Sequence, residues 1–391
     1  MKIVDRWLLP EGVEDVLPPQ ANRTEEVRRR LLDLYSTWGY EYVIPPIVEY
    51  LESLLTGTGH DLDLKTLKVT DLKSGRTMGL RADITPQVAR IDAHSLNKSG
   101  VVRLCYAGTV VHSQPDGLLE SRTPLSVGAE LFGDSSNRGD IEIVSLMIES
   151  LRSLGLKGVK IDLGDVAIYR QLVASLGLTS HEQEQVFAAV QKKSPREIAG
   201  LLEAFGVETK KSDLLGALPG LMGDVLMLEG ARQIFNDYPG IVECIDNLQR
   251  VAEAVQNRFE DIQIYFDLSE LRGYEYHTGI VFSAYVDGLR HGVAKGGRYD
   301  HIGEVFGRVA RGATGFSINV RNIASEEIIE THTRPSVVVA EGNDEDQVGL
   351  WHEMNRLRKE GYAVLETGEP SGHELLLIRK ADKWVLTQRE D

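Results

Sequence analysis

The first regular feature of the chain is an amphipathic segment over residues 21–38, which predicts a helix. Its apolar residues recur at helical spacing: Val27, Leu31, Leu34, Tyr35 and Trp38. Gly39 ends the predicted helix, and residues 40–48 then indicate an extended segment. Because Pro45 and Pro46 cannot donate to a β-ladder, we expect this segment at a sheet edge or at a subunit boundary.

The following part of the chain has the pattern of antiparallel strands. Short apolar runs separated by polar turns occupy residues 67–81 and 101–111. A helix is predicted over residues 140–154, where the apolar residues keep to one side. Three further strands are predicted over residues 262–268, 279–285 and 312–320.

Two segments differ from this pattern. Residues 166 to about 260 carry apolar residues at helical spacing with few β-rich runs, so we interpret them as a helical insertion. A small α/β unit is expected near the end of the chain. Its predicted elements are a strand over 337–339, a helix over about 344–359, and strands near Val364 and over 375–378.

Composition limits the class of protein. A length of 391 residues exceeds the ~250 to 300 at which a single core stops growing, so two or more domains are expected. The net charge of −16 argues against non-specific binding to nucleic-acid phosphates. The N-terminus lacks the order of a signal peptide, and no apolar run approaches the ~18 residues of a membrane span. We therefore expect a cytoplasmic protein with no membrane contact.

The sequence shows no sign of a cofactor. Cys105 and Cys244 are too few for a disulfide framework or a cysteine zinc site, and their apolar neighbours predict that both are buried. Signatures of phosphate-binding loops, dinucleotide sites, nucleophile elbows and zinc proteases do not occur in the sequence. The ten histidines are scattered, and none pairs with a cysteine at metal-ligand spacing. We expect neither a metal nor a cofactor.

Two polar segments carry candidate ligand-binding carboxylates. In LRADITPQVAR, Asp83 stands near Thr85, and their oxygens can hold an α-ammonium group or simply form a turn that caps a helix. Pro-Asp-Gly at residues 115–117 is a strong turn signal, so its flanks are expected to form adjacent antiparallel strands. Glu130 lies among small and apolar residues, where an unpartnered carboxylate is costly. It is a ligand-binding candidate, with an internal ion pair as the alternative.

Two later segments combine rings, cations and glycines. LRGYEYHTGIVF, over residues 271–282, places one arginine and three ring side chains before a hydrophobic strand, a composition suited to a small polar ligand with a carboxylate. GGRYD, over residues 296–300, is followed by a glycine-containing stretch over 312–320. Glycines there allow a ligand to approach the backbone closely, or merely supply bends.

In this order and spacing, the four segments resemble the class II aminoacyl-tRNA synthetase core of histidyl-tRNA synthetase. The resemblance covers about residues 9–325, and LRGYEYHTG followed by GGRYD is highly specific. It implies an α+β fold in which an antiparallel six-stranded sheet is flanked by helices, in a homodimer. Residues 1–325 would be the synthetase-like core with the helical insertion inside it. Residues 336–391 would be a small acidic unit resembling a truncated anticodon-binding domain.

The chain departs from that family where the family binds ATP. In the synthetases the second motif contains Phe-Arg-x-Glu, whose arginine grips the α-phosphate, and here His112 stands at the arginine position. The third motif ends in Gly-Leu-x-Arg, but here Asn319 replaces the glycine and Asn322 the arginine. The neighbouring Arg321 should point to another face. Loss of one preorganised donor typically costs ~10² to 10³ in rate, so the resemblance implies that adenylation is abolished.

The amino-acid end of the resembled site is better kept. The residues that fit the family's histidine pocket are Asp83 in place of a glutamate, Thr85, Glu130, Arg272 and Tyr276. Two positions depart from it, because Ser126 replaces a glutamine and His277 a tyrosine. The resemblance therefore implies a remnant histidine-binding site formed by these seven residues.

The C-terminal unit departs from the synthetases too. Residues 336–391 carry 7 Lys and Arg against 12 Asp and Glu, so no tRNA binding is expected. A synthetase-like chain without ATP and tRNA contacts resembles the regulatory subunits of ATP phosphoribosyltransferase, which are histidyl-tRNA synthetase paralogues. This resemblance implies no catalysis of its own, a homodimer within a hetero-oligomer such as a hetero-octamer, a short-form catalytic subunit as partner, and histidine as feedback inhibitor of the first step of histidine biosynthesis. The alternatives are a divergent histidyl-tRNA synthetase and an amino-acid sensor with another partner.

Overall fold

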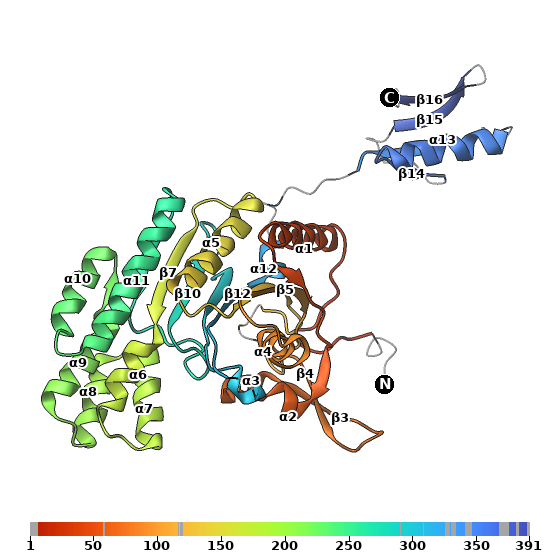
Figure 1. The fold of residues 1–391 in the computed structure, drawn as a ribbon. Helices are drawn as coiled ribbons and strands as arrows, with labels where there is room; N and C mark the ends of the chain where they lie inside the picture. The colour runs from red at the N-terminus through yellow and green to blue at the C-terminus, as the bar shows by residue number, and fades with distance from the viewer. Residues whose placement is uncertain are drawn as a thin grey trace. The chain divides into compact units, whose positions relative to one another are not determined.

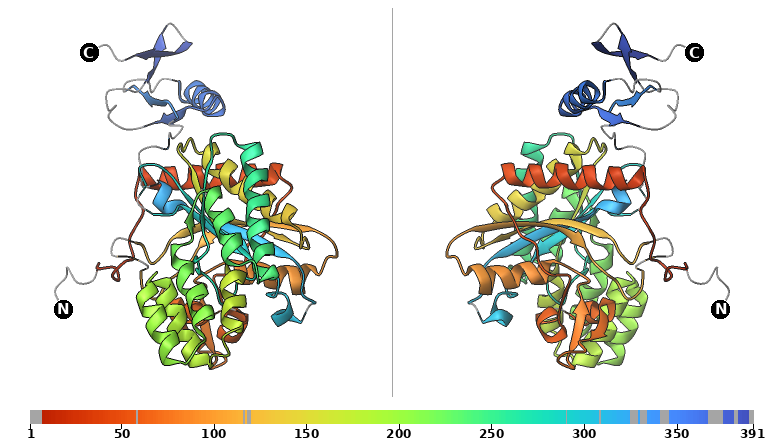
Figure 2. Two further views of the ribbon diagram at one scale, coloured as in Figure 1. Left: turned by 90° about the vertical axis from the view of Figure 1, so that its left-hand side faces the viewer. Right: turned by 90° about the vertical axis from the view of Figure 1, so that its right-hand side faces the viewer.

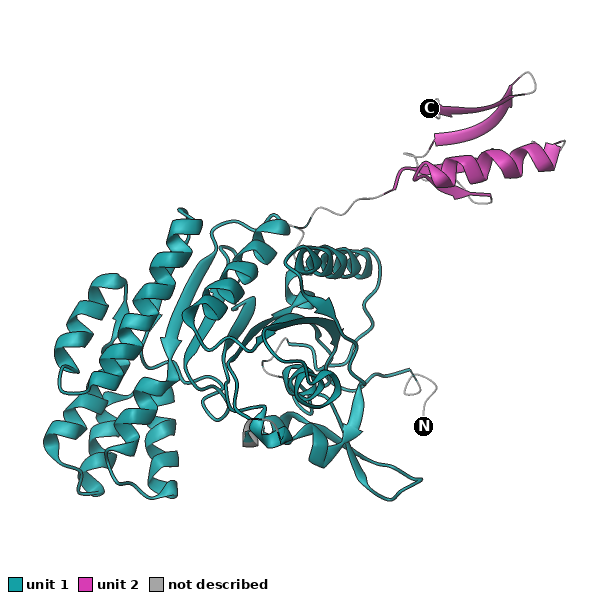
Figure 3. Ribbon diagram, in the orientation of Figure 1, with its two compact units in different colours: residues 1–329 teal, residues 330–391 magenta. Residues whose placement is uncertain are grey.

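The computed structural model divides the chain into two compact units, residues 1–329 and 330–391 (Figure 3). It describes residues 7–57, 59–115, 117, 120–289, 291–307, 309–324, 329, 334–340, 346–366, 375–380 and 383–388. The turn residue Asp116 and the expected helix start near Asp344 lie outside the described residues.

The first unit is built on a nine-stranded sheet in the order β1-β5-β6-β12-β11-β10-β7-β9-β8 (Figure 1). Its strands are β1 (Glu41–Tyr42), β5 (Val102–Thr109), β6 (Leu125–Phe132), β7 (Lys160–Asp165), β8 (Met222–Gly223), β9 (Gln263–Asp267), β10 (Ile280–Tyr285), β11 (Ala294–Arg298) and β12 (Ala313–Asn319). The six strands from β5 to β7 pair antiparallel, whereas β1 joins β5 and β9 joins β7 in parallel. The expected six-stranded antiparallel sheet is therefore the centre of a wider mixed sheet.

Three long helices pack together on one face of this sheet: α1 (Gln20–Thr37), α5 (Asn137–Ser153) and α11 (Pro239–Arg258). Helix α1 begins and ends within one residue of the predicted bounds, and Gly39 follows it with a φ of 81°. A left-handed conformation of this kind favours glycine, so the predicted stop signal is confirmed. Helix α5 begins three residues before its predicted start, because the side chain of Ser136 caps it. The short helix α12 (Val320–Ala324) packs against α1.

The opposite face of the sheet carries shorter elements. Helix α4 (Thr85–Arg90) and the π-helical turn η2 (Ile91–Leu96) pack there through Ile84, Val88 and Ala89 against apolar side chains of β5. Both views of Figure 2 show α4 in orange and α1 in red on opposite sides of the strands. Next to α4 lie α2 (Leu51–Leu54), α3 (His60–Lys65) and a small sheet of β2 (Val48–Tyr50), β4 (Thr77–Leu80) and β3 (Leu67–Thr70).

The extended segment predicted over residues 40–48 forms only two short strands. Strand β1 lies at the edge of the large sheet, as predicted, and β2 at the edge of the small one. Pro45 and Pro46 lie between them, where the missing N–H groups interrupt no ladder.

Residues 166–258 form helices apart from β8 and the 3₁₀ turn η3 (Leu218–Gly220). Before α11 these helices are α6 (Val166–Ala174), α7 (Ser180–Gln191), α8 (Pro195–Ala204), α9 (Thr209–Ala217) and α10 (Val225–Ile234). Sequence features explain two of the helix starts. Asp165 caps α6, and Thr179 with Glu182 forms a capping box on α7. None of the described helices is long and apolar enough to cross a membrane.

The second unit is a four-stranded sheet in the order β14-β13-β15-β16 with one packed helix. Its elements are β13 (Ser336–Val339), α13 (Gln347–Lys359), β14 (Ala363–Leu365), β15 (Leu375–Lys380) and β16 (Lys383–Gln388). The core contains Val337 and Leu377 from the sheet and Met354 and Leu357 from the helix. The sequence pattern had not indicated β16, although Trp384 and Leu386 pack against this core.

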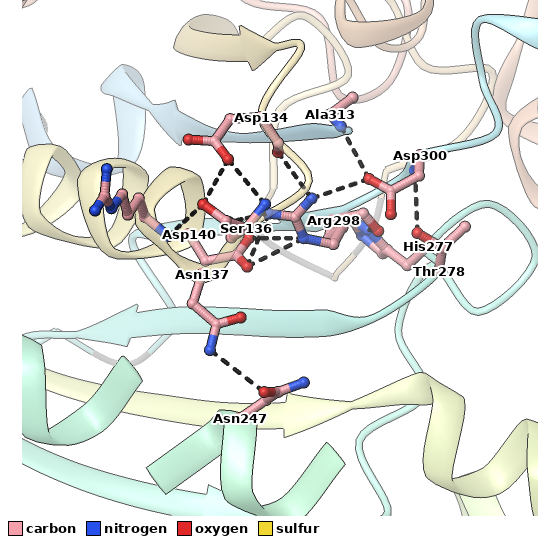
Figure 4. Close-up of polar contacts among 11 residues, drawn as sticks. Asp134, Ser136, Asn137, Asp140, Asn247, His277, Thr278, Arg298, Asp300 and Ala313 are labelled. Atoms are coloured by element: carbon pink, nitrogen blue, oxygen red, sulfur yellow. Dashed lines mark hydrogen bonds and ion pairs between the residues drawn. The ribbon is translucent and has the colours of Figure 1, made fainter. Parts of the chain in front are cut away.

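A buried ion pair ties the large sheet to α5 (Figure 4). The Arg298 guanidinium on β11 donates to both carboxylate oxygens of Asp140 on α5, at 2.9 to 3.2 Å. It also donates to the carboxylate of Asp300 and to the backbone oxygens of Asp134 and Ser136, each at 3.1 Å. Burial raises the pKa of Asp140, and Arg298 opposes that shift. Every guanidinium nitrogen therefore has a partner at this depth.

We expect Asp140→Asn to destabilise the first unit strongly. Removing one charge of a buried pair leaves the other uncompensated, at a typical cost of about 3 to 5 kcal/mol in the free energy of unfolding. The matched control is Asp287→Asn, because Asp287 pairs with Lys160 at 2.8 Å with 65% of its side chain exposed. The control should cost less than about 1 kcal/mol. Urea unfolding of both variants measures the difference, and equal small losses would contradict the role given to Asp140.

Candidate functional site

A cavity of about 340 Å³ opens on the face of the large sheet away from α5. Beneath it, a row of residues is aligned across five strands: Gly164, Val281, Gly297, Gly315 and Glu130, of which Val281, Gly315 and Glu130 line the cavity. Three of the five are glycines, and two of these are in close contact with site residues. A Cβ on Gly315 would lie 1.6 Å from Glu130 Oε2, and one on Gly297 would lie 2.7 Å from the His277 ring. The missing side chains create the space in which both groups lie.

Glu130 is a buried carboxyl group held by hydroxyls. Thr85 Oγ1 donates to Glu130 Oε1 at 2.8 Å, and the Tyr299 hydroxyl contacts Oε2. Glu130 forms no ion pair with the described residues, so the internal ion pair considered from the sequence is not what holds it. Burial raises the pKa of Glu130 to about 8, because desolvation outweighs the hydrogen bonds. A cationic ligand would compensate this carboxylate.

Asp83 and Thr85 lie at the start of α4. Asp83 Oδ1 accepts the Thr85 backbone N–H at 3.0 Å, which forms a turn just before α4, whereas the N-cap residue of the helix, Ile84, makes no side-chain cap. Both residues also line the cavity, and the Thr85 hydroxyl connects α4 to Glu130. The turn expected from the sequence is therefore present in two residues that also line the cavity, whereas the expected side-chain helix cap is not.

The loop over residues 271–278 forms one wall of the cavity. Arg272 forms an ion pair with Glu270, in which Nε at 2.9 Å and Nη2 at 2.6 Å both donate to Oε2. The His277 ring is buried and packs on Tyr276 with 4.3 Å between ring centroids. Because a carbonyl only accepts, His277 Nδ1 donates to the Arg298 oxygen at 3.3 Å. Burial lowers the pKa of His277 to about 4, so this imidazole is neutral at physiological pH.

The helical segment holds this loop from the other side. Arg170 on α6 donates to the backbone oxygens of Tyr274 and His277, both at 2.9 Å. Its guanidinium also lies over the Tyr274 ring, 4.9 Å from the centroid. Phe187 on α7 packs against the same ring at 5.2 Å and lines the cavity. The cavity is thus enclosed jointly by the sheet, by α4 and by the first helices that follow β7.

The structure brings six of the seven predicted histidine-binding residues to this cavity. They are Asp83, Thr85, Glu130, Arg272, Tyr276 and His277. Ser126 does not line it. It lies on β6 opposite Gly108 and Asn319, four residues before Glu130, and four residues of strand span about 13 Å.

Several cavity residues had not been singled out from the sequence. They are Phe187 and Gln191 on α7, and Asp162, Ser283, Lys295 and Ser317 on the sheet. A strand pattern identifies two faces but not which one meets a ligand, so a local signal could not have found the sheet residues. Among the described residues, no group of three or more His, Cys, Asp or Glu side chains could hold a metal ion.

The two predicted lost ATP contacts lie outside this cavity. His112 Nε2 is 3.1 Å from the Ala82 oxygen, and Asn322 is on α12. Arg321 is buried, donating to Ser121 Oγ at 2.7 Å and to Glu14 Oε1 at 2.6 Å. Arg122 donates to the backbone oxygens of His112 and Glu11. Both arginines near these positions are engaged within the chain.

Comparison with known proteins adds independent evidence. The family model described as histidyl-tRNA synthetase matches residues 12–323. The ATP phosphoribosyltransferase regulatory subunit of Stutzerimonas stutzeri is 48% identical over 391 residues, covering 100% of this chain and 98% of that protein.

Solved structures share the fold. An ATP phosphoribosyltransferase regulatory subunit/histidyl-tRNA synthetase from Bacillus halodurans has a TM-score of 0.80 at 23% identity, covering 93% of this chain and 94% of that chain. The ATP phosphoribosyl transferase (HisG:HisZ) complex from Thermotoga maritima contains a chain with a TM-score of 0.59 at 18% identity, covering 78% of this chain and 98% of that one. The class II synthetase-like fold expected from the sequence is thereby confirmed.

The raised pKa of Glu130 predicts a pH-dependent stability. Between pH 4.5 and about 8 the folded chain keeps a proton on Glu130 that the unfolded chain loses. The free energy of unfolding therefore falls as pH rises through this window, by up to about 1.4 kcal/mol per pH unit. Relative to Glu130→Gln, the wild type should lose about 2 to 3 kcal/mol between about pH 5.5 and 7.5 in urea unfolding. Parallel pH profiles for the two proteins would show that Glu130 has an ordinary pKa.

Proposed function

Because the chain belongs to the family of ATP phosphoribosyltransferase regulatory subunits, which share the histidyl-tRNA synthetase fold, we propose that it assembles with a short-form catalytic subunit and conveys inhibition by histidine to it. The chain is a regulatory subunit of histidine biosynthesis. The 48% identity along its full length is the observation that carries this function. The Thermotoga maritima structure, a HisG:HisZ complex, supports the proposed assembly.

We expect no synthetase activity because the cations that would bind ATP phosphates are missing or engaged elsewhere. At the position where the synthetases place an α-phosphate arginine, the chain has His112, whose ring faces a backbone oxygen. The neighbouring Arg321 is neutralised by Glu14. Stabilisation of a transferring phosphate requires preorganised cations aimed at the charge. Without such cations at these two positions, the divergent-synthetase alternative has no support.

Histidine is proposed to bind in the cavity above the glycine row. Asp83, Thr85 and Glu130 supply carboxylate and hydroxyl oxygens for the α-ammonium group and for ring N–H groups. Arg272, Tyr276 and His277 form the facing wall. Histidine inhibits the assembly only if it binds the inactive form more tightly, by a typical ~1 to 3 kcal/mol.

We further propose that the chain forms a homodimer within a larger cytoplasmic hetero-oligomer. The edge strand β1 leaves backbone groups unpaired in the described sheet. Around it, Tyr42, Ile44 and Ile47 expose 45%, 77% and 46% of their surfaces. Exposed apolar side chains beside an open edge favour a protein partner there.

Assembly predicts a gain of activity in the partner. Mixing the purified chain with a short-form catalytic subunit should raise the rate of phosphoribosyl transfer, and added L-histidine should lower it again. The mass of the mixture in solution should correspond to a hetero-oligomer that contains dimers of this chain. As the control, the chain alone should show no histidine-dependent ATP–pyrophosphate exchange. Robust exchange, or no change in transfer rate on mixing, would contradict the proposal.

The cavity predicts which variants lose histidine binding. Glu130→Ala and Arg272→Ala should each weaken L-histidine binding in calorimetry by about tenfold or more, since each removes a charge or a hydrogen-bonding group of the site. Arg232→Ala is the matched control, because Arg232 pairs with Asp246 outside the cavity. Circular dichroism checks that the variants are folded. Unaltered binding in both cavity variants would place histidine elsewhere, for instance at a subunit interface.

A further inference from the structure

A second row of residues crosses the cavity floor beside the glycine row, and its side chains are polar. Asp162, Ser283, Lys295 and Ser317 are cross-strand neighbours on β7, β10, β11 and β12. All four line the cavity. Each lies two residues along its strand from a member of the glycine row, so both rows share one face of the sheet. The polar row is therefore part of the same site.

The two rows are separated by a distance that suits a single small ligand. Two residues of strand span about 7 Å. Glu130 and the His277 ring lie at the glycine row. Lys295, Ser283 and Ser317 belong to the polar row beside it. A free amino acid placed on the floor between the rows would contact both of them. Its ammonium group fits the side of Asp83 and Glu130, and its carboxylate needs a cation on the other side.

Lys295 provides that cation. Arg272, which the sequence suggested for a carboxylate, has its charge paired with Glu270 at 2.6 Å. Lys295 lines the cavity and forms no ion pair with the described residues. Its charge acts inside the site, since Lys295 is among the groups that lower the pKa of His277. The cavity thus has Asp83 and Glu130 at one side and, at the other, an ammonium without an ion pair among the described residues. On that second side Glu270 is paired with Arg272, and Asp162 lies two strands from Lys295.

The neighbours of Lys295 complete an anion site. Ser283 and Ser317 stand directly opposite Lys295 on the two adjacent strands, where paired Cβ atoms lie about 4.5 to 5.5 Å apart. Each hydroxyl can donate one hydrogen bond to a carboxylate oxygen that the ammonium also contacts. Arg298, three residues after Lys295 on β11, binds Asp140 and so anchors this strand to α5. The position of Lys295 along the floor is therefore fixed by the packing of β11.

We propose that Lys295, flanked by Ser283 and Ser317, binds the carboxylate of the amino acid held in this cavity, and so makes the site specific for an amino acid over the corresponding amine. This inference rests on the proposed histidine site and adds the group that recognises the carboxylate. Oxygens of Asp83 and Glu130 select the cationic end, and Lys295 selects the anionic end.

Calorimetry with two ligands tests this assignment. L-histidine carries both groups, whereas histamine has the same ring and ammonium group but no carboxylate. Lys295→Met should weaken histidine binding by about 10- to 100-fold, the usual range for a charge-assisted hydrogen bond. The same change should leave histamine binding within about threefold, because histamine makes no contact that depends on the lysine charge. Lys295→Arg, which keeps the charge, should retain histidine binding within about tenfold.

The matched control is Lys160→Met. Lys160 lies on the same face of the sheet but pairs with Asp287 outside the cavity, so its removal should change neither affinity. Equal affinity of wild type and Lys295→Met for histidine, or an equal loss for both ligands, would overturn the role of Lys295 while leaving the histidine site in place. Failure of the wild type to bind histidine at all would overturn the site and this inference together.

Discussion

The buried ion pair between Arg298 and Asp140 is the constraint on which the rest of the site depends. Two charges at this depth are costly to desolvate, and they are tolerated because the guanidinium is satisfied on every side. The backbone oxygen of Arg298 accepts from the Thr278 N–H at 2.8 Å. The Asp300 carboxylate, which pairs with Arg298, accepts the Ala313 N–H at 2.9 Å. Arg298 and its partner Asp300 therefore fix the start of α5, the wall loop and the start of β12.

The cavity arises from a contrast between the two faces of β11. One face presents Arg298 to α5, and the other carries Lys295, which lines the cavity, and Gly297, which lies against the His277 ring. Glycines on three strands remove the side chains that a packed sheet would carry, so Glu130 and the His277 ring fill part of the space. Strand β11 is therefore anchored to α5 through one face and borders the open cavity with the other.

The chain differs in two ways from what the synthetase site needs, one for the amino acid and one for ATP. Binding an amino acid needs complementary charges at equilibrium, and in the proposed site the cavity offers carboxylates, hydroxyls and a lysine. Activating it with ATP needs cations aimed at a phosphate, and here Arg321 is instead engaged by Glu14 and Ser121. A subunit that senses an effector requires the first property and not the second. The helices that carry Arg170 and Phe187 contact the wall loop directly.

The sequence by itself determined the long helices, the edge position of residues 40–48 and the residue types of the site. These signals are local, because helical spacing, prolines and short motifs act over a few residues. It did not indicate β11, whose glycines conceal the strand pattern, and it grouped Ser126 with residues that the fold keeps about 13 Å away. Only the tertiary structure decided which face of each strand meets the ligand. That choice depends on register between strands that lie far apart in the chain, and a shift of one residue would turn Lys295 and Glu130 away from the cavity.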